Sequence, residues 1–100
     1  MPPCIDSPPL PALLAQRYLT VAHPLGLHLR PANAIVKLVT RSHSNVRIRY
    51  GNHEADARSI IDILSLGVPP GTEVIVLADG PDAEAVIESL SKLFADGFGW

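Results

Sequence analysis

The segment Gly26-Leu27-His28-Leu29-Arg30-Pro31-Ala32 combines residue types that could bind and transfer an anion. His28 stands just before a helix that the sequence predicts from Pro31. The first amides of a helix have no acceptors inside it and its dipole is positive there, so an anion is stabilised. Arg30 adds a planar cation suited to phosphate. An imidazole beside an anion pocket is what phosphorylation on histidine requires. The alternative is a histidine that only caps the helix.

The other candidate residues form no recognisable site. His23, His43 and His53 lack metal-ligand spacing with one another or with Cys4, so we expect surface or turn histidines. We expect Cys4 to be a spectator thiol. The sequence supports no serine–histidine–acid arrangement and no glycine-rich phosphate loop, and we expect neither a metal nor a cofactor.

Length and composition limit the class of protein. One hundred residues with 47% hydrophobic residues predict one globular domain. The net charge of −2 excludes a nucleic-acid binder that relies on a large basic excess. Residues 1–58 hold seven basic residues against three acids, whereas residues 59–100 hold one against seven. This asymmetry predicts a basic face near the first helix, suited to an anion or an acidic partner, unless the charges are only clustered at random.

The N-terminal residues differ from the rest. Five prolines fall within the first eleven residues, so we expect residues 1–16 to be a proline-rich flexible extension and residues 17–100 to be the folded domain. The extension has no basic region before its apolar stretch and is a poor match to a secretory signal. No apolar run is long enough to span a membrane, and one cysteine makes no internal disulfide. A cytoplasmic location without membrane insertion is expected.

The predicted elements alternate between strands and helices. Strands are expected at 17–23, 46–50, 53–57 and 72–78, and helices at 31–40, 59–66 and from 80–82 to Gly97. The alternation of Val46, Ile48 and Tyr50 with two arginines is typical of a half-buried strand. This βαββαβα order predicts an α+β two-layer sandwich with helices on one face of the sheet and a polar open face.

Two segments and the order of the elements resemble one family. The Gly26–Ala32 segment closely resembles the active-site segment of HPr, the histidine phosphocarrier of the bacterial phosphoenolpyruvate-dependent phosphotransferase system. The segment from Ala57 to Gly67 is similar to the regulatory-serine segment of that family. The resemblance covers about residues 17–97 and implies an open-faced sandwich with a four-stranded antiparallel sheet and three helices on one face.

The resemblance implies a role for each residue of the first segment. His28 corresponds to the histidine that accepts the phosphoryl group on Nδ1, and Arg30 to the arginine that steadies the phosphate. The donor would be enzyme I and the acceptor an enzyme IIA-type protein, which makes the chain a monomeric, stoichiometric carrier rather than an enzyme. Leu25 and Leu29 depart from the family, which usually has polar residues beside the histidine.

Ser59 resembles the serine that HPr kinase/phosphorylase modifies in many bacteria. The alternative is that Ser59 only caps the helix that follows. Asp62 departs from the regulated members, which usually have a small residue there, and its carboxylate would oppose a phosphate.

The family docks its partners on the first helix and the short helix after Ser59. The expected docking residues are Leu29, Lys37, Arg58, Ile60, Ile61 and Leu64, with Arg30 at their edge. The alternative for Ile60, Ile63 and Leu64 is the core, and we expect it to hold for at least two of them.

Other functions remain as alternatives. The chain could be a regulatory docking module of the HPr fold, nitrogen-related or Crh-like, in which His28 is idle. The ending at 93–98 resembles the nitrogen-related branch, whereas the serine segment resembles the general branch. An autonomous enzyme is disfavoured because no second catalytic group accompanies His28.

Overall fold

The computed structural model describes residues 14–22, 24 and 26–97. Its elements follow the predicted order. They are β1 (Leu14–Thr20), α1 (Leu29–Thr40), β2 (Asn45–Tyr50), β3 (His53–Asp56), α2 (Ile60–Ser65), β4 (Glu73–Asp79) and α3 (Ala83–Ala95).

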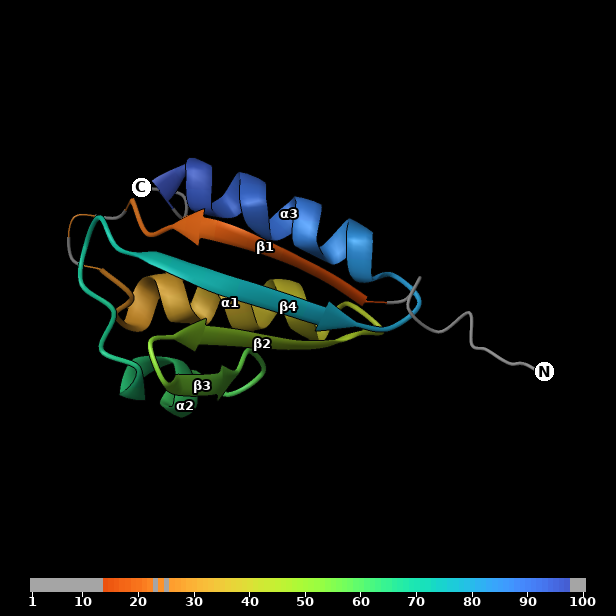
Figure 1. Ribbon diagram of the computed structural model, residues 1–100, viewed down its shortest axis with the longest axis horizontal. Coiled ribbons are helices and arrows are strands. Elements are labelled where there is room, and N and C mark those ends of the chain that lie inside the picture. Colours follow the sequence, from red (N-terminus) through yellow and green to blue (C-terminus); the bar gives the residue numbers. More distant parts are fainter. Residues whose placement is uncertain (1–13, 23, 25, 98–100) are drawn as a thin grey trace.

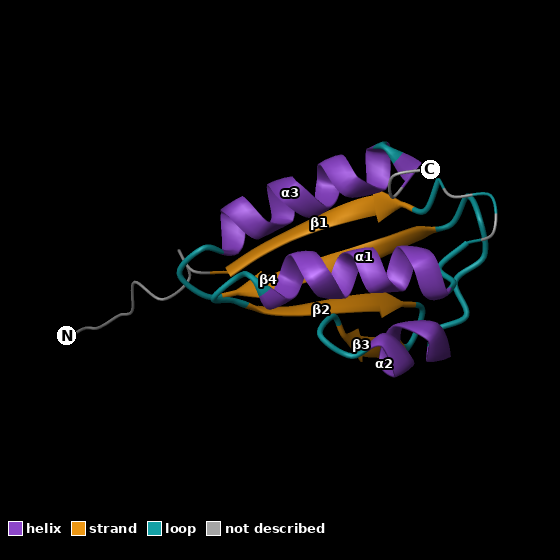
Figure 2. Cartoon of the chain, turned by 180° about the vertical axis from the view of Figure 1, so that it is seen from behind, coloured by secondary structure: helices purple, strands orange, loops and turns teal. Residues whose placement is uncertain are grey.

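The four strands form one antiparallel sheet in the order β1-β4-β2-β3. Figure 1 shows the sheet from its open side, and Figure 2 shows the three helices that cover the other side. The predicted open-faced two-layer sandwich is therefore confirmed.

The helix-covered side of the sheet carries the core. In β2 the buried Val46 and Ile48 alternate with the exposed Arg47 and Arg49, so the period of two separates the layers. The helices add their apolar sides to the same core. The largest fully buried side chains are those of Phe94, Ile35, Ile48, Ile63, Ile87, Leu90, Val21, Val39, Val46, Val74 and Val76.

The first strand differs from the prediction at both ends. It begins at Leu14 rather than at residue 17, because the last proline of the N-terminal run is Pro11 and the following amides can pair. The pairs Leu14–Asp79 and Gln16–Leu77 show that β4 is long enough to receive them. Residues 14–16 of the predicted extension therefore belong to the sheet. Residues 1–13, Leu25, and His23 at the predicted end of the strand lie outside the described residues.

Two further boundaries move by a few residues. The first helix begins at Leu29 instead of Pro31, and Pro31 sits in its first turn, where an amide would have no helical acceptor. The second helix begins at Ile60 because Ser59 is its N-cap rather than its first residue.

A polar contact joins the loop after α1 to the start of α3. The Asp82 carboxylate accepts hydrogen bonds from the His43 amide, at 3.2 and 3.0 Å, and from the hydroxyl of Ser44, the buried polar residue of the described chain. These bonds hold the pKa of Asp82 below its usual range. Gly80 makes the approach possible, since a Cβ there would lie 2.6 Å from the Ser44 Cα. The contact fixes α1 and α3 relative to β2.

Candidate functional site

His28 is the N-cap residue of α1. Its backbone is extended, with φ −105° and ψ −165°, and its carbonyl accepts the first helical hydrogen bond from the Ala32 amide at 2.9 Å. The half-buried imidazole therefore stands at the positive end of a 12-residue helix. The first turn of α1 contains no acidic residue that would occupy this position in place of an external anion.

One ring nitrogen of His28 is closed to solvent. Nε2 is buried, although the residue as a whole is partly exposed. An imidazole has two nitrogens, and the burial of Nε2 leaves Nδ1 as the candidate for an outside reagent. Arg30 lies two residues later and is exposed, which places a multi-donor cation on the same turn of the helix.

The loop before His28 is held by the loop before β4. The Leu27 amide donates to the Val68 carbonyl at 3.0 Å, and the Leu27 side chain is buried. The Gly71 amide donates to the Val21 carbonyl at 2.8 Å, and this bond holds the chain just after β1 against the loop before β4. His28 is thus positioned by backbone contacts from both sides.

Gly26 is the residue that allows this contact. Its φ is +73°, a region that L-residues rarely adopt, and a Cβ would overlap the Val68 carbonyl oxygen. The sequence marked Gly26 as a turn residue, but it gave no signal for Val68, because the partner atom is a backbone oxygen far along the chain.

Exposed apolar side chains gather where α1 and α2 pack together. Leu29 is 59% exposed, Ile61 76% and Leu64 37%. The Leu27–Val68 bond joins the segment after α2 to the segment before α1, so the end of α2, which carries Leu64, lies toward the start of α1, and Ile61 lies three residues earlier on α2. We name Leu29, Ile61 and Leu64 the α1–α2 face. A surface of this composition is suited to protein contact.

Two of the isoleucines have a different position. Ile63 is fully buried and Ile60 is partly buried against the core. The alternative that these side chains belong to the core therefore holds for both. Among the apolar residues predicted to dock a partner, Ile60 is the least exposed.

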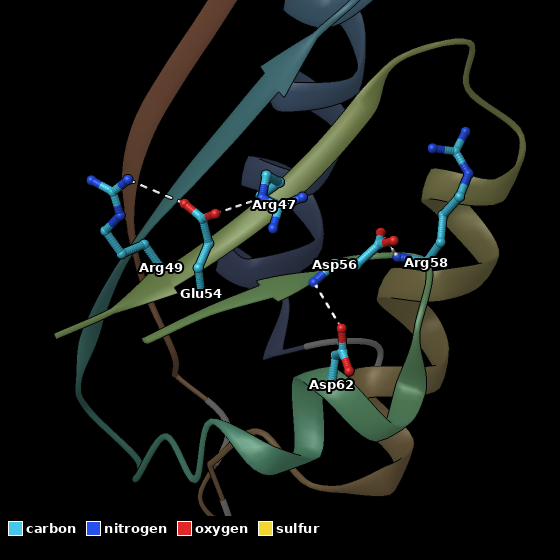
Figure 3. Close-up of polar contacts among 6 residues, drawn as sticks. All are labelled: Arg47, Arg49, Glu54, Asp56, Arg58 and Asp62. Carbon is cyan, nitrogen blue, oxygen red and sulfur yellow. Dashed lines mark hydrogen bonds and ion pairs between the residues drawn. The ribbon is translucent and has the colours of Figure 1, made fainter. Parts of the chain in front are cut away.

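Arg58 lies away from His28. Its guanidinium donates to the carbonyls of Ser44 at 2.8 Å, Ser42 at 3.0 Å and Val39 at 3.3 Å. Figure 3 shows it beside the C-terminal end of α1. A helix of this length spans about 18 Å, which separates Arg58 from the His28 end of α1. Its side chain caps the negative end of α1. Lys37, by contrast, is exposed in the last turn of α1.

Ser59 lies in a segment with two acidic residues, Asp56 and Asp62. Its hydroxyl accepts from the Asp62 amide at 3.2 Å and so caps α2. The Asp62 carboxylate accepts from the Asp56 amide at 3.4 Å, and the Asp56 carboxylate accepts from the Arg58 amide at 2.9 Å (Figure 3). A phosphate on Ser59 would therefore add negative charge to a segment that already carries the Asp56 and Asp62 carboxylates.

In residues 14–22, 24 and 26–97, histidine, cysteine and acidic side chains form no group of three or more that could hold a metal ion. None of the helices in this part of the chain is long and apolar enough to cross a bilayer.

The chain is similar to known proteins both in sequence and in fold. The family model for the PTS HPr component phosphorylation site matches residues 15–96. The chain belongs to the HPr family. As a member of it, the chain is a phosphocarrier of the phosphotransferase system, and the resemblance seen in the sequence is confirmed.

Individual relatives agree with this assignment. The phosphocarrier protein HPr of Chlamydia trachomatis is 39% identical over 80 residues, which are 80% of this chain and 73% of the relative. HPr of Thermoanaerobacter tengcongensis superposes with a TM-score of 0.82 at 32% identity, covering 86% of this chain and 97% of its own. The Bacillus subtilis catabolite repression protein Crh has a TM-score of 0.68 at 31% identity, covering 83% and 95%.

The close contact of Gly26 and Leu27 with the Val68 carbonyl predicts that two glycines differ in how much stability is lost when each is replaced by alanine. Gly51 also has a positive φ, +61°, but a Cβ there meets nothing within 4 Å. We expect Gly51→Ala to cost about 1–2 kcal/mol of unfolding free energy from backbone strain alone. Gly26→Ala should cost more, because it also disrupts a buried hydrogen bond worth about 1 kcal/mol. Urea titration measures both, and equal losses would show that the Val68 contact contributes nothing.

Proposed function

We propose that Nδ1 of His28 accepts a phosphoryl group from phosphorylated enzyme I and passes it to an enzyme IIA-type protein. The observation that carries this proposal is the half-buried imidazole at the N-cap of α1, with Nε2 buried and Arg30 on the same turn. Nδ1 is then the nitrogen left to the donor.

The step needs positioning and charge stabilisation more than further covalent chemistry. The Nδ1 lone pair forms the new N–P bond while the bond from phosphorus to the donor's leaving atom breaks and its electron pair departs with the donor. This requires the proton of the neutral ring to be on Nε2. The positive end of α1 and the Arg30 guanidinium stabilise the charge on the transferred oxygens. The reverse step delivers the group to the acceptor, so the chain is a stoichiometric carrier with no turnover of its own.

The α1–α2 face supplies the contact with both partners in this proposal. Its apolar side chains would be covered on docking, and Arg30 and Lys37 would attract acidic surfaces. The monomer presents one such face, so enzyme I and the acceptor would bind in turn. Because phosphoenolpyruvate and enzyme I are on the inner side of the membrane in this scheme, we place the carrier in the cytoplasm.

The role of Ser59 follows from its surroundings. We propose that it acts chiefly as the N-cap of α2, and that Asp56 and Asp62 oppose modification by HPr kinase/phosphorylase. We expect Asp62→Ala to be phosphorylated by that kinase with ATP faster than the wild-type chain, and Ser59→Ala not at all. Intact-mass measurement gives the stoichiometry. Equal rates in the wild type and Asp62→Ala would refute the proposed opposition.

The carrier role is tested by phosphorylation with enzyme I and phosphoenolpyruvate. We expect one acid-labile, alkali-stable phosphate, which is lost in His28→Ala and retained in His53→Ala, a matched change at an exposed histidine on β3. Arg30→Gln should retain the site but slow transfer by about tenfold or more, as loss of a charge-stabilising donor does. Phosphate that persists in His28→Ala would place the acceptor elsewhere.

Docking is tested with charges placed on the α1–α2 face. Leu29→Asp and Ile61→Asp should each raise the KM of enzyme I for the carrier by roughly tenfold, equivalent to about 1.4 kcal/mol of lost contact. The kcat should change little, because neither side chain holds the phosphate. Tyr18→Asp, at another exposed apolar side chain but on the strand β1, is the control. If all three variants behave alike, enzyme I binds another surface.

A further inference from the structure

The side of α1 that faces away from α2 borders a groove. Figure 2 shows α1 between α2 and α3 on the helix-covered side of the sheet. The hydrogen bonds of Asp82 with His43 and Ser44 bring the start of α3 to the end of α1, so the two helices run in opposite directions. A groove of about 620 Å³ lies between them. We name it the α1–α3 groove, and its walls include Ala34, Lys37 and Arg41 on the side of α1 and Asp82, Ala85 and Ser89 on the side of α3.

The groove has an apolar floor between small side chains. The half-buried Leu38 and the buried Val86 supply the apolar surface. Ala34 and Ala85 line the two walls, and neither has a side chain long enough to fill the space between the helices. The helices that form the walls are about 18 and 20 Å long, which is the length of about three turns of a further helix.

Exposed cations stand on both sides of the groove. Lys37 and Arg41 are exposed, and no ion pair in residues 14–22, 24 and 26–97 involves either of them. Lys92 is exposed on α3, three residues after Ser89 and seven after Ala85, so it continues the side of α3 that lines the groove.

Acidic groups oppose these cations only weakly. Asp82 lines the groove, but its carboxylate accepts hydrogen bonds from the His43 amide and the Ser44 hydroxyl and so is held at the end of the groove. Glu88 pairs with an arginine of β1, and Glu84 is not among the residues that line the groove. The groove therefore keeps a positive charge that suits an acidic ligand.

The spacing of the cations indicates the form of that ligand. Lys37 and Arg41 are one turn apart, about 6 Å along α1. Acidic residues four positions apart on another helix have the same spacing, so each cation can meet a separate carboxylate. A nucleic acid is a poor fit, because the whole chain has a net charge of −2.

We propose that the α1–α3 groove binds a helical segment of a partner protein that carries acidic side chains at every fourth position and apolar side chains beside them. The carboxylates pair with Lys37 and Arg41, and the apolar side chains cover Leu38 between Ala34 and Ala85. The groove and the α1–α2 face lie on opposite sides of α1 (Figure 2). A partner in the groove therefore leaves the α1–α2 face uncovered, and its binding does not depend on phosphoryl transfer at His28.

The test adds a synthetic helical peptide of about 15 residues, about 22 Å long, to the isotope-labelled full chain and follows the amide signals by NMR. The peptide has glutamate at every fourth position and alanine and leucine beside these glutamates. We expect saturable shifts at Lys37, Arg41, Ala85 and Ser89, and little change at Ile61. A peptide of the same composition with its glutamates spread around the helix should bind about fivefold more weakly, because fewer ion pairs form. Equal affinities, or shifts centred on the α1–α2 face, would overturn the proposal.

Matched variants locate the contact. Arg41→Gln and Arg49→Gln remove the same charge from exposed arginines, the first in the groove and the second on the open face of the sheet. Arg41→Gln should weaken peptide binding by about threefold to fivefold, and Arg49→Gln should leave it unchanged. Ala85→Glu places a carboxylate on the opposite, exposed wall and should weaken binding by about tenfold. Equal effects of the two arginine variants would contradict the proposed site.

Inorganic phosphate distinguishes a site for small anions. It is added to the complex and compared with sodium chloride at the same ionic strength, which screens charges equally. We expect both salts to displace the peptide to the same extent. If phosphate displaces it further and itself shifts the Arg41 and Ser89 amides, the groove binds small anions and the proposed helical partner is wrong.

Discussion

The approach of the Gly26–Leu27 backbone to the carbonyl of Val68 determines where His28 stands. This contact joins the segment after β1 to the segment before β4, two strands that are already neighbours in the sheet. The sheet therefore positions the loop, and the loop determines where α1 begins. Only a residue without a Cβ can occupy the contact point, so one steric constraint couples the core to the reactive ring.

The two ends of α1 are used in opposite ways. The positive end faces His28 and has no acid in its first turn, which leaves it available for an external anion. At the negative end, Arg58 donates to the carbonyl of Val39 in the last turn and to those of Ser42 and Ser44 in the loop that follows. The fold thus supplies a cation to the C-terminal end of the helix, whereas the N-terminal end has no acidic residue in its first turn.

The sequence was sufficient for the element order and for the position of His28 and Arg30 at the start of the first helix. Strong periodicity predicted β2 and β4, and the Gly26–Ala32 segment indicated His28 and Arg30, because these signals are local. Properties that depend on distant partners were not predictable in the same way. The start of β1 depends on the length of β4, and the contacts of Arg58 depend on carbonyls 14 to 19 residues away. Neighbouring positions on α2 likewise divide between core and surface only once the helix is placed: Ile63 is buried and Leu64 is exposed.

In the structure, the basic residues that are in excess in the first 58 positions lie in separate places. Arg47 and Arg49 lie on the open face and both pair with Glu54, whose pKa they hold below its usual range (Figure 3). Arg17 pairs with Glu88 of α3. Arg30, Lys37 and Arg41 are exposed on α1 or just after it.

The spacing of those three residues, seven and then four, aligns them along one side of α1, which begins after its N-cap His28 and ends before its C-cap Arg41. A stripe of like charge beside His28 would act mainly on the rate of association with an acidic partner, because it would orient that partner before contact and would weaken with salt. In the docking that we propose, only this part of the basic excess in the first 58 residues takes part. The remainder stabilises the sheet and the ends of the helices, and a count of charges along the sequence cannot distinguish the two.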